Sequence, residues 1–383
     1  MPRAGSANRV ALPVAVVFFV NGVLFASWIP RIPEVQARLD LSVSALGVAM
    51  AGVGLGGLVG TLLSPTLIAR VGSRPAAVVA GTGMALTLPV VALAPSAWSL
   101  MAVLLVAGLF DAVTDIAMND LGVQVQRRFG RSFMNRLHAG WSFGALTGAL
   151  VSSAVAAADV GVGVHIGAVG VLSSAALATV WRSLPADPPL LRPSVPRRSK
   201  MGAAGVLLPL AFATAVVESV PAEWSGVFLA DVHGLGPGVV GLGFTFLAAG
   251  MLVGRLAGDT VIERAGSETT LRLAAALVLV GLATTVLSGL PAIAVVGFGL
   301  MGLGSSVMFP VIYGAAGSLS VMSSGAGLAL LSLGARLGFL AGPPLVGLVA
   351  DASNLRVAMG ALVFVGLLGI IGSRSRLDRY AAS

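Results

Sequence analysis

The chain has 383 residues, of which 57% are apolar and only 10% are charged, and its mean hydropathy is +0.98. This composition excludes a soluble globular protein, and the absence of cysteine excludes disulfides and thiolate metal sites. The net charge of +8 does not indicate nucleic-acid binding, because no soluble domain remains to hold a duplex.

Apolar stretches long enough to cross a bilayer recur along the whole chain. A hydrocarbon core of about 30 Å requires roughly 20 helical residues. The stretches of this length predict twelve spans: 10–29, 42–67, 76–94, 99–122, 138–158, 161–181, 202–229, 238–260, 271–289, 291–316, 325–350 and 355–372. We interpret the first as an uncleaved helix, because Asn21 interrupts it and no clear small-residue cleavage site follows.

Basic residues predict the orientation of these spans, because short cytoplasmic loops are enriched in Lys and Arg. If both termini are cytoplasmic, only Arg31, Arg38 and Arg356 fall outside, and Arg255 and Arg336 lie within spans. All other basic residues are then cytoplasmic. The distribution therefore predicts a multi-pass protein with both termini in the cytoplasm.

The longest hydrophilic stretch lies at the midpoint of the chain. Residues 182–200 are rich in Pro and Arg and predict a cytoplasmic linker. The predicted organisation is an amino-terminal six-helix half at 1–181, a linker at 182–201, and a carboxy-terminal six-helix half with a short cytoplasmic tail at 202–383.

An internal repeat relates the two halves with an offset of 194 residues. The segment 69–73 (ARVGS) matches 263–267 (ERAGS) at this offset. The same offset pairs two glycine ladders, Gly140, Gly144 and Gly148 with Gly334, Gly338 and Gly342. Chance could produce one ladder among 51 glycines, but two independent motifs with one offset favour a duplication. The predicted fold class is therefore an all-α integral membrane protein of twelve transmembrane helices in two pseudo-symmetric six-helix bundles.

These loop motifs resemble the signature of the major facilitator superfamily, which lies between helices two and three and recurs between helices eight and nine. The second copy keeps the acid–base pair Glu263–Arg264 before Gly266, whereas the first has Ala69 where an acid is expected. In that family the charges of this loop help to hold one conformer of the transport cycle. The resemblance therefore implies a cytoplasmic gate, for which the candidates are Arg70, Gly72, Arg255, Asp259, Glu263, Arg264 and Gly266.

Further motifs resemble a narrower bacterial branch, the MosC-like transporters, which is similar to the fucose-permease type of sugar symporter. The matching stretches are 25–33 (FASWIPRIP), 115–119, 138–142 (HAGWS), 223–225, 254–259 (GRLAGD) and 342–345. The Gly-Pro signature of drug antiporters is missing, since Ala149 follows Gly148. The resemblance implies a transporter of the bacterial inner (plasma) membrane, but it does not imply a ligand.

Ionisable residues within the spans are the candidates for proton coupling, because a charge near the bilayer centre is costly and is seldom kept without a function. Asp111, Asp115 and Asn119 are spaced by four and share one helix face. Glu218 lies near the helix break expected at Pro221. A structural role in an ion pair is the alternative for each of the three carboxylates, whereas Glu223 is expected to face water.

Substrate contact is expected from amide side chains, aromatic side chains and one arginine within the spans. The candidates are Asn21, Asn119, Trp141, Phe309, Tyr313 and Arg336. Each of the amide and aromatic residues has core packing as its alternative, and Arg336 must find either an acid or an anionic ligand. Trp28 is assigned to the outer aromatic belt, and a role for His138 at a helix start is favoured over a proton relay.

The function that follows is secondary active transport of a small solute by alternating access, with proton-coupled symport of a sugar-like or small polar compound favoured. Proton-driven efflux of a metabolite or drug-like compound is the alternative, and a transport-inactive membrane sensor is a third hypothesis. An enzyme is not expected, because the three histidines are dispersed. The expected partners are the small-molecule substrate, protons and the lipid bilayer, with no nucleic acid, cofactor or metal, and the chain is expected to be a monomer.

Overall fold

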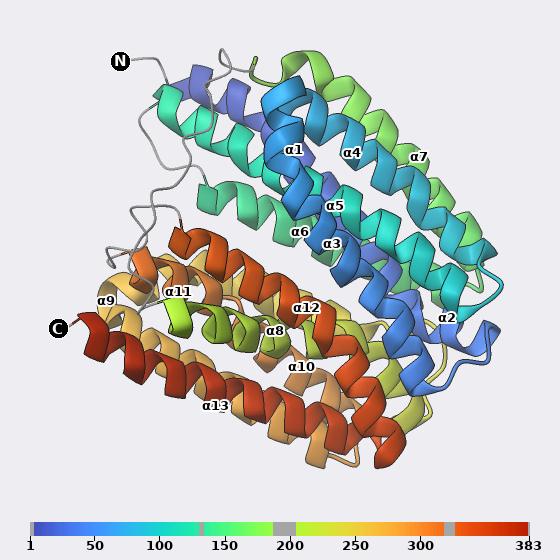
Figure 1. The fold of residues 1–383 in the computed structure, drawn as a ribbon. Helices are drawn as coiled ribbons and strands as arrows, with labels where there is room; N and C mark the ends of the chain where they lie inside the picture. Colours follow the sequence, from blue (N-terminus) through green and yellow to red (C-terminus); the bar gives the residue numbers. More distant parts are fainter. Residues whose placement is uncertain (1–3, 130–133, 187–203, 318–325, 382–383) are drawn as a thin grey trace.

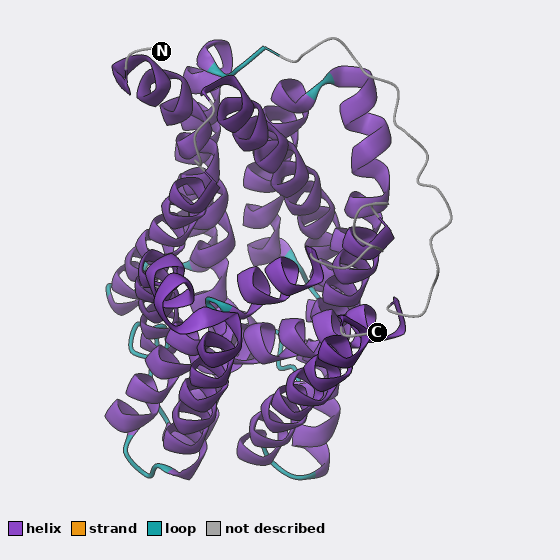
Figure 2. Ribbon diagram, turned by 90° about the vertical axis from the view of Figure 1, so that its left-hand side faces the viewer, coloured by secondary structure: helices purple, strands orange, loops and turns teal. Residues whose placement is uncertain are grey.

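The computed structural model describes residues 4–129, 134–186, 204–317 and 326–381, and the described residues are helical apart from short connections (Figures 1 and 2). The first group of α-helices is α1 Ala4–Trp28, α2 Ile32–Arg38, α3 Val43–Val71, α4 Ser73–Thr87, α5 Ala97–Phe129, α6 Met134–Ala157 and α7 Val162–Val180. The second group is α8 Ala204–His233, α9 Leu242–Leu287, α10 Pro291–Ser305, α11 Met308–Gly317, α12 Ala326–Ala352 and α13 Leu355–Ala381. Three short 3-10 helices are η1 Ile29–Arg31, η2 Leu88–Leu93 and η3 Trp181–Ser183.

The helices account for each of the twelve predicted spans. Ten described helical stretches are long and apolar enough to cross a membrane, and a shorter apolar one is Leu355–Ile371 in α13. One of the ten, α9, has 46 residues, which is enough for two spans, and its backbone is non-helical at Gly266. The tenth predicted span corresponds to α10 and α11 together. The all-α membrane fold is therefore confirmed, whereas most of the predicted linker lies outside the described residues.

The helices form two groups, α1–α7 and α8–α13, which are the upper and lower parts of Figure 1. Equivalent pairs pack in each group: α1 on α6 and α3 on α5 in the first, α8 on α12 and α9 on α10 in the second. The glycine ladders explain the close approach. A Cβ at Gly144 would overlap the Phe19 carbonyl, and one at Gly338 would lie 2.6 Å from the Phe212 carbonyl oxygen. Backbone packing through small residues thus replaces large apolar side chains at these contacts.

The internal repeat is also visible in the backbone. Gly72 follows α3 with φ 89° and ψ 162°, and Gly266 interrupts α9 with φ 78° and ψ 159°. Both lie in a region that is open to glycine but strained for other residues. Two equivalent loop glycines therefore turn the chain in the same way between consecutive spans of each half.

The two groups contact each other mainly at one end of the molecule. We call the end where α1 begins and α13 ends the terminal face, and the other end, near α2, the opposite face; the groups converge toward the opposite face in Figure 1. There Ser44 of α3 donates a hydrogen bond to Asp351 of α12, and the Ser153 hydroxyl of α6 lies 3.5 Å from that of Thr245 in α9. The opposite face is therefore the closed one.

Candidate functional site

The first part of the candidate site is a chain of hydrogen bonds that links three helices of the first group. The Asn21 amide of α1 donates to Asp111 of α5 at 2.9 Å, and the Trp141 indole of α6 donates to the Asn21 carbonyl oxygen at 2.7 Å. Asn21 is only 4% exposed. Asp111 therefore has a fixed donor, and the Asn21 side chain is oriented from both ends.

The second part contains Asp115, another of the three predicted carboxylates, and it connects the two groups. Asp115 accepts a hydrogen bond from the Asn119 amide at 3.1 Å, and the Asn119 carbonyl oxygen lies 3.1 Å from Nε2 of His138. On its other side, Asp115 Oδ2 lies 3.6 Å from Nη2 of Arg336 in α12. The Asp115 side chain is 41% exposed and that of Arg336 is 21% exposed, so this ion pair borders open space rather than a closed core.

Arg255 supplies a second contact between the groups. Its Nη1 donates to the Ser142 hydroxyl of α6 at 2.6 Å, and its guanidinium carbon lies 5.2 Å from the centre of the Trp141 ring. Glu218 of α8 lies within electrostatic reach of the same guanidinium. The structure places Arg255 beside Trp141, in the same cluster as Asp111 and Asn21, and the gate role of Arg255 stays a prediction.

The remaining gate candidates lie toward the terminal face. Gly72 ends α3 and Gly266 interrupts α9, and the exposed residues Arg70, Asp259, Glu263 and Arg264 flank these two glycines. The structure thus brings the two loop motifs to the same face of the molecule, apart from the central cluster.

The charges of the cluster are divided between the two groups. Asp111 and Asp115 belong to the first group, and the two arginines belong to the second. Under the 194-residue repeat, the partner of Arg336 is Ser142 and the partner of Asp115 is Phe309. The two halves have therefore diverged at these positions, so that Asp115 and Arg336 face each other from opposite groups.

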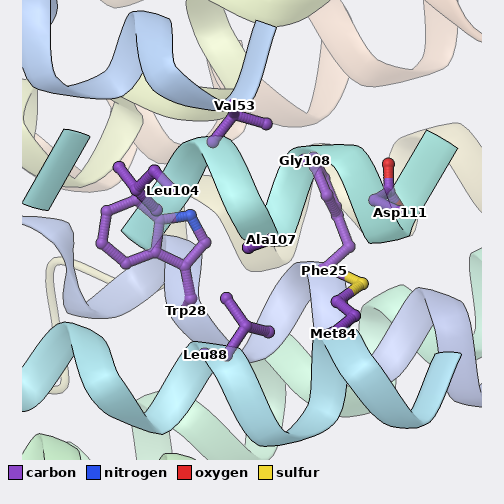
Figure 3. Close-up of a pocket in the computed structure, with 9 residues that line it drawn as sticks. All are labelled: Phe25, Trp28, Val53, Met84, Leu88, Leu104, Ala107, Gly108 and Asp111. Carbon is purple, nitrogen blue, oxygen red and sulfur yellow. The ribbon is translucent and has the colours of Figure 1, made fainter. Parts of the chain in front are cut away.

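A small apolar pocket of about 20 Å³ adjoins Asp111 within the first group (Figure 3). Its lining comes from α1, α3, α4, η2 and α5 and consists of Phe25, Trp28, Val53, Met84, Leu88, Leu104, Ala107, Gly108 and Asp111. Trp28 and Asp111 stand at opposite ends of it in Figure 3. The assignment of Trp28 to the outer aromatic belt was wrong, because its side chain is 5% exposed and packs among these helices.

The remaining predictions concern Phe309, Tyr313 and Glu223. Phe309 of α11 packs against the apolar core, and the side chain of Tyr313 lies outside the described residues. The expectation that Glu223 faces water was wrong, because its Oε2 is buried and has no hydrogen-bond partner among the described residues. No cluster of three or more His, Asp or Glu side chains that could hold a metal ion occurs in the described part of the chain.

Comparisons with known proteins agree with this architecture. The sequence profile of the Major Facilitator Superfamily matches residues 14–299. An uncharacterized MFS-type transporter of Yersinia pestis is 30% identical over 98% of this chain and 97% of its own length. The membrane protein MosC of Rhizobium meliloti is 26% identical over 93% of this chain and 87% of its own.

Solved structures show the same fold at low sequence identity. The crystal structure of a mutant of the nucleoside transporter NupG superimposes with a TM-score of 0.77 at 12% identity and covers 97% of this chain and 99% of that one. At this identity the likeness concerns the fold alone.

Proposed function

The chain belongs to the major facilitator superfamily, whose members carry out secondary transport across membranes, and from this premise we propose that it is a proton-coupled symporter of a sugar-like or small polar solute. The observation that carries the proposal is the ion pair between Asp115 and Arg336, which joins the two helix groups and borders open space. A titratable carboxylate at such a contact can link protonation to the relative position of the groups.

The proposed topology has both termini on the cytoplasmic side of the bacterial inner membrane. The terminal face is then cytoplasmic and the opposite face is external. Contacts such as Ser44 with Asp351 close the external side, and the groups diverge toward the cytoplasm. The conformation described above would accordingly be the inward-facing state, in which the halves 1–181 and 202–383 have rocked apart at the cytoplasmic end.

The proposed mechanism begins at Asp115. When its carboxylate is ionised, it attracts Arg336 across the interface; when it binds a proton, the attraction between opposite charges is lost. The cost of leaving a guanidinium without an acid then favours another arrangement of the two groups or the binding of a ligand. Asp111 is the second proton site in this scheme, held by Asn21. Glu218 is the proton-coupling candidate of the carboxy-terminal half, where its charge acts on Arg255.

The proposed solute lies between the groups. Asn119 and His138 offer amide and imidazole groups for hydroxyl recognition, and the Trp141 ring offers an aromatic face. Asn21, which is 4% exposed, supports this face from behind by accepting a hydrogen bond from the Trp141 indole. Arg336 and Arg255 contribute from the second group. The residues thus converge from α1, α5, α6, α9 and α12, as expected for a site that both halves share.

A ligand-stabilisation screen on the detergent-purified protein tests this proposal. We expect sugars, polyols or related small polar compounds to raise the unfolding temperature, because a ligand at 100 times its dissociation constant adds about 2.7 kcal/mol. The Asn119→Ala variant should lose the effect, whereas Asn354→Ala, which removes an amide that accepts from the Val357 N–H of α13, should keep it. Stabilisation by bulky amphiphiles alone, unchanged in Asn119→Ala, would instead favour efflux of a drug-like compound.

A further inference from the structure

Arg336 has more hydrogen-bonding capacity than the protein uses. A guanidinium carries five N–H donors. Within the described residues it donates no hydrogen bond, and its nearest carboxylate oxygen, on Asp115, lies 3.6 Å away, which is too long for a hydrogen bond. Gly57 of α3 lies next to the guanidinium: a Cβ added at Gly57 would be 3.3 Å from Nη1 of Arg336. Because no described group accepts a hydrogen bond from Arg336 and its side chain is 21% exposed, its donors remain available to a ligand between the groups.

Arg255 is a second cation in the same space. It also belongs to the second group, and it donates one hydrogen bond to the Ser142 hydroxyl. Its guanidinium carbon lies over the ring of Trp141, whose indole N–H orients Asn21. Two guanidiniums within membrane spans are costly, because each desolvated cation requires an acid or an anion. Glu218 lies near Arg255, whereas the acids within electrostatic reach of Arg336 among the described residues are Asp115, at 3.6 Å, and Asp111 beyond it.

We infer that the solute is a hydroxylated organic acid whose carboxylate replaces Asp115 as the partner of Arg336. This inference rests on the proposed function and narrows its substrate class. A planar guanidinium binds a carboxylate through two parallel hydrogen bonds, and Arg336 has the free donors to do so. A hydroxyl group of the solute would meet Asn119 on the facing group.

Charge balance couples binding of the acidic solute to protonation of Asp115. The ionisable groups that face Asp115 are Asp111 one turn away on α5, Arg336 on α12 and, through Asn119, His138 on α6. An incoming carboxylate would be repelled by an ionised Asp115 and would compete with it for Arg336. A proton on Asp115 removes both obstacles. One proton therefore enters with each negative charge of the solute, and the pair crosses the membrane without net charge.

Matched ligand pairs test this inference by calorimetry on the purified full-length protein. The probes are D-gluconate against D-glucitol and D-glucuronate against D-glucose, since each pair differs mainly in its carboxylate. We expect the two acids to bind and the two neutral compounds to bind at least tenfold more weakly, since a charge-assisted hydrogen bond is roughly twice as strong as a neutral one. The affinity for the acids should fall with rising pH by up to tenfold per unit, the limit for one linked proton.

Substitutions at Arg336 and at Asp115 separate the roles of the two members of the ion pair. Arg336→Gln should abolish binding of gluconate, and Arg336→Lys should restore part of it. Arg38→Gln is the control, because that arginine donates to the carbonyls of Val91 and Ala92 at the opposite face. Asp115→Asn should bind gluconate with an affinity that falls much less steeply with rising pH than that of the wild-type protein. This variant tests the inference even if Arg336→Gln does not fold.

Each contrary result has a distinct meaning. Equal binding of glucitol and gluconate would overturn the inference about the acid and leave the proposed proton-coupled transport intact. Failure of both acids to bind the wild-type protein, or binding that is the same at every pH, would also overturn the inference. If neutral sugars bound and then moved without protons, the proposed function would fail as well.

Discussion

Replacement of Asp115 by asparagine is expected to abolish proton-driven accumulation of the solute while leaving solute exchange intact. Asparagine has the same shape but cannot take up or release a proton, and it cannot hold Arg336 by charge. In proteoliposomes with an imposed proton gradient, the steady-state solute ratio of the variant should fall to unity. Counterflow of labelled against unlabelled solute requires no proton release and should continue.

A second aspartate on the same helix provides the control for this experiment. Asp120 of α5 accepts hydrogen bonds from Ser73 and, at 2.8 Å, from Gln124, away from the central cluster. Asp120→Asn should lose stability but keep its accumulation ratio. Full accumulation in Asp115→Asn, or loss of both accumulation and counterflow, would remove Asp115 from the coupling mechanism.

A disulfide between the two groups at the opposite face is expected to stop transport reversibly. Ser153 and Thr245 are buried, and their hydroxyl oxygens lie 3.5 Å apart across the interface of α6 and α9. Cysteine side chains at these positions would therefore approach each other across the interface, as a cross-link between the groups needs. If the groups must separate at this face in each cycle, the oxidised Ser153→Cys, Thr245→Cys double variant should lose nearly all transport, and dithiothreitol should restore it.

The chain is suited to this experiment because it has no cysteine of its own. Each single variant treated with the same oxidant is the control and should transport normally. A double variant that is fully cross-linked on a gel yet still transports would show that this contact need not open, and it would contradict rocking of the two groups about the central cluster.

The fold was predictable from the sequence because its signals are local and repeated. The length of each apolar stretch is set by bilayer thickness, so the twelve spans follow from composition. Gly72 and Gly266 could be paired by their offset alone, and the structure gives both a positive φ. The glycine ladder of α6 likewise indicated a flat contact, which Gly144 makes against α1. Such features require no knowledge of distant partners.

The pairings of the site were not predictable in the same way. The spacing of Asp111 and Asp115 placed them on one face, but it did not indicate that Arg336 would meet Asp115 from the other half. Arg255 was predicted as a gate residue because it lies near the cytoplasmic end of its span. Contact with Ser142 depends on how α9 crosses α6, which hydropathy does not encode. The stretch 138–142 was the available signal, since it supplies both Trp141 and Ser142.

Glu223 shows a second limit of sequence reasoning. Its position near the end of a span and beside Trp224 suggested the aqueous interface, because both residue types occur there. The structure buries Trp224 completely and leaves the Glu223 Oε2 without a partner among the described residues. The sequence shows how far along its helix Glu223 lies. Whether neighbouring helices bury it depends on the tertiary packing of α8, which the sequence pattern does not show.

Proton movement during solute efflux is the most direct measurement of the central claim. Proteoliposomes loaded with a stabilising solute and a pH-sensitive dye would be diluted into solute-free medium without an imposed pH gradient. Symport predicts that the lumen becomes more alkaline as solute leaves, because protons leave with it, and that Asp115→Asn shows no such change. A lumen that becomes more acidic would indicate antiport, and solute efflux without any pH change in the wild-type protein would contradict proton coupling altogether.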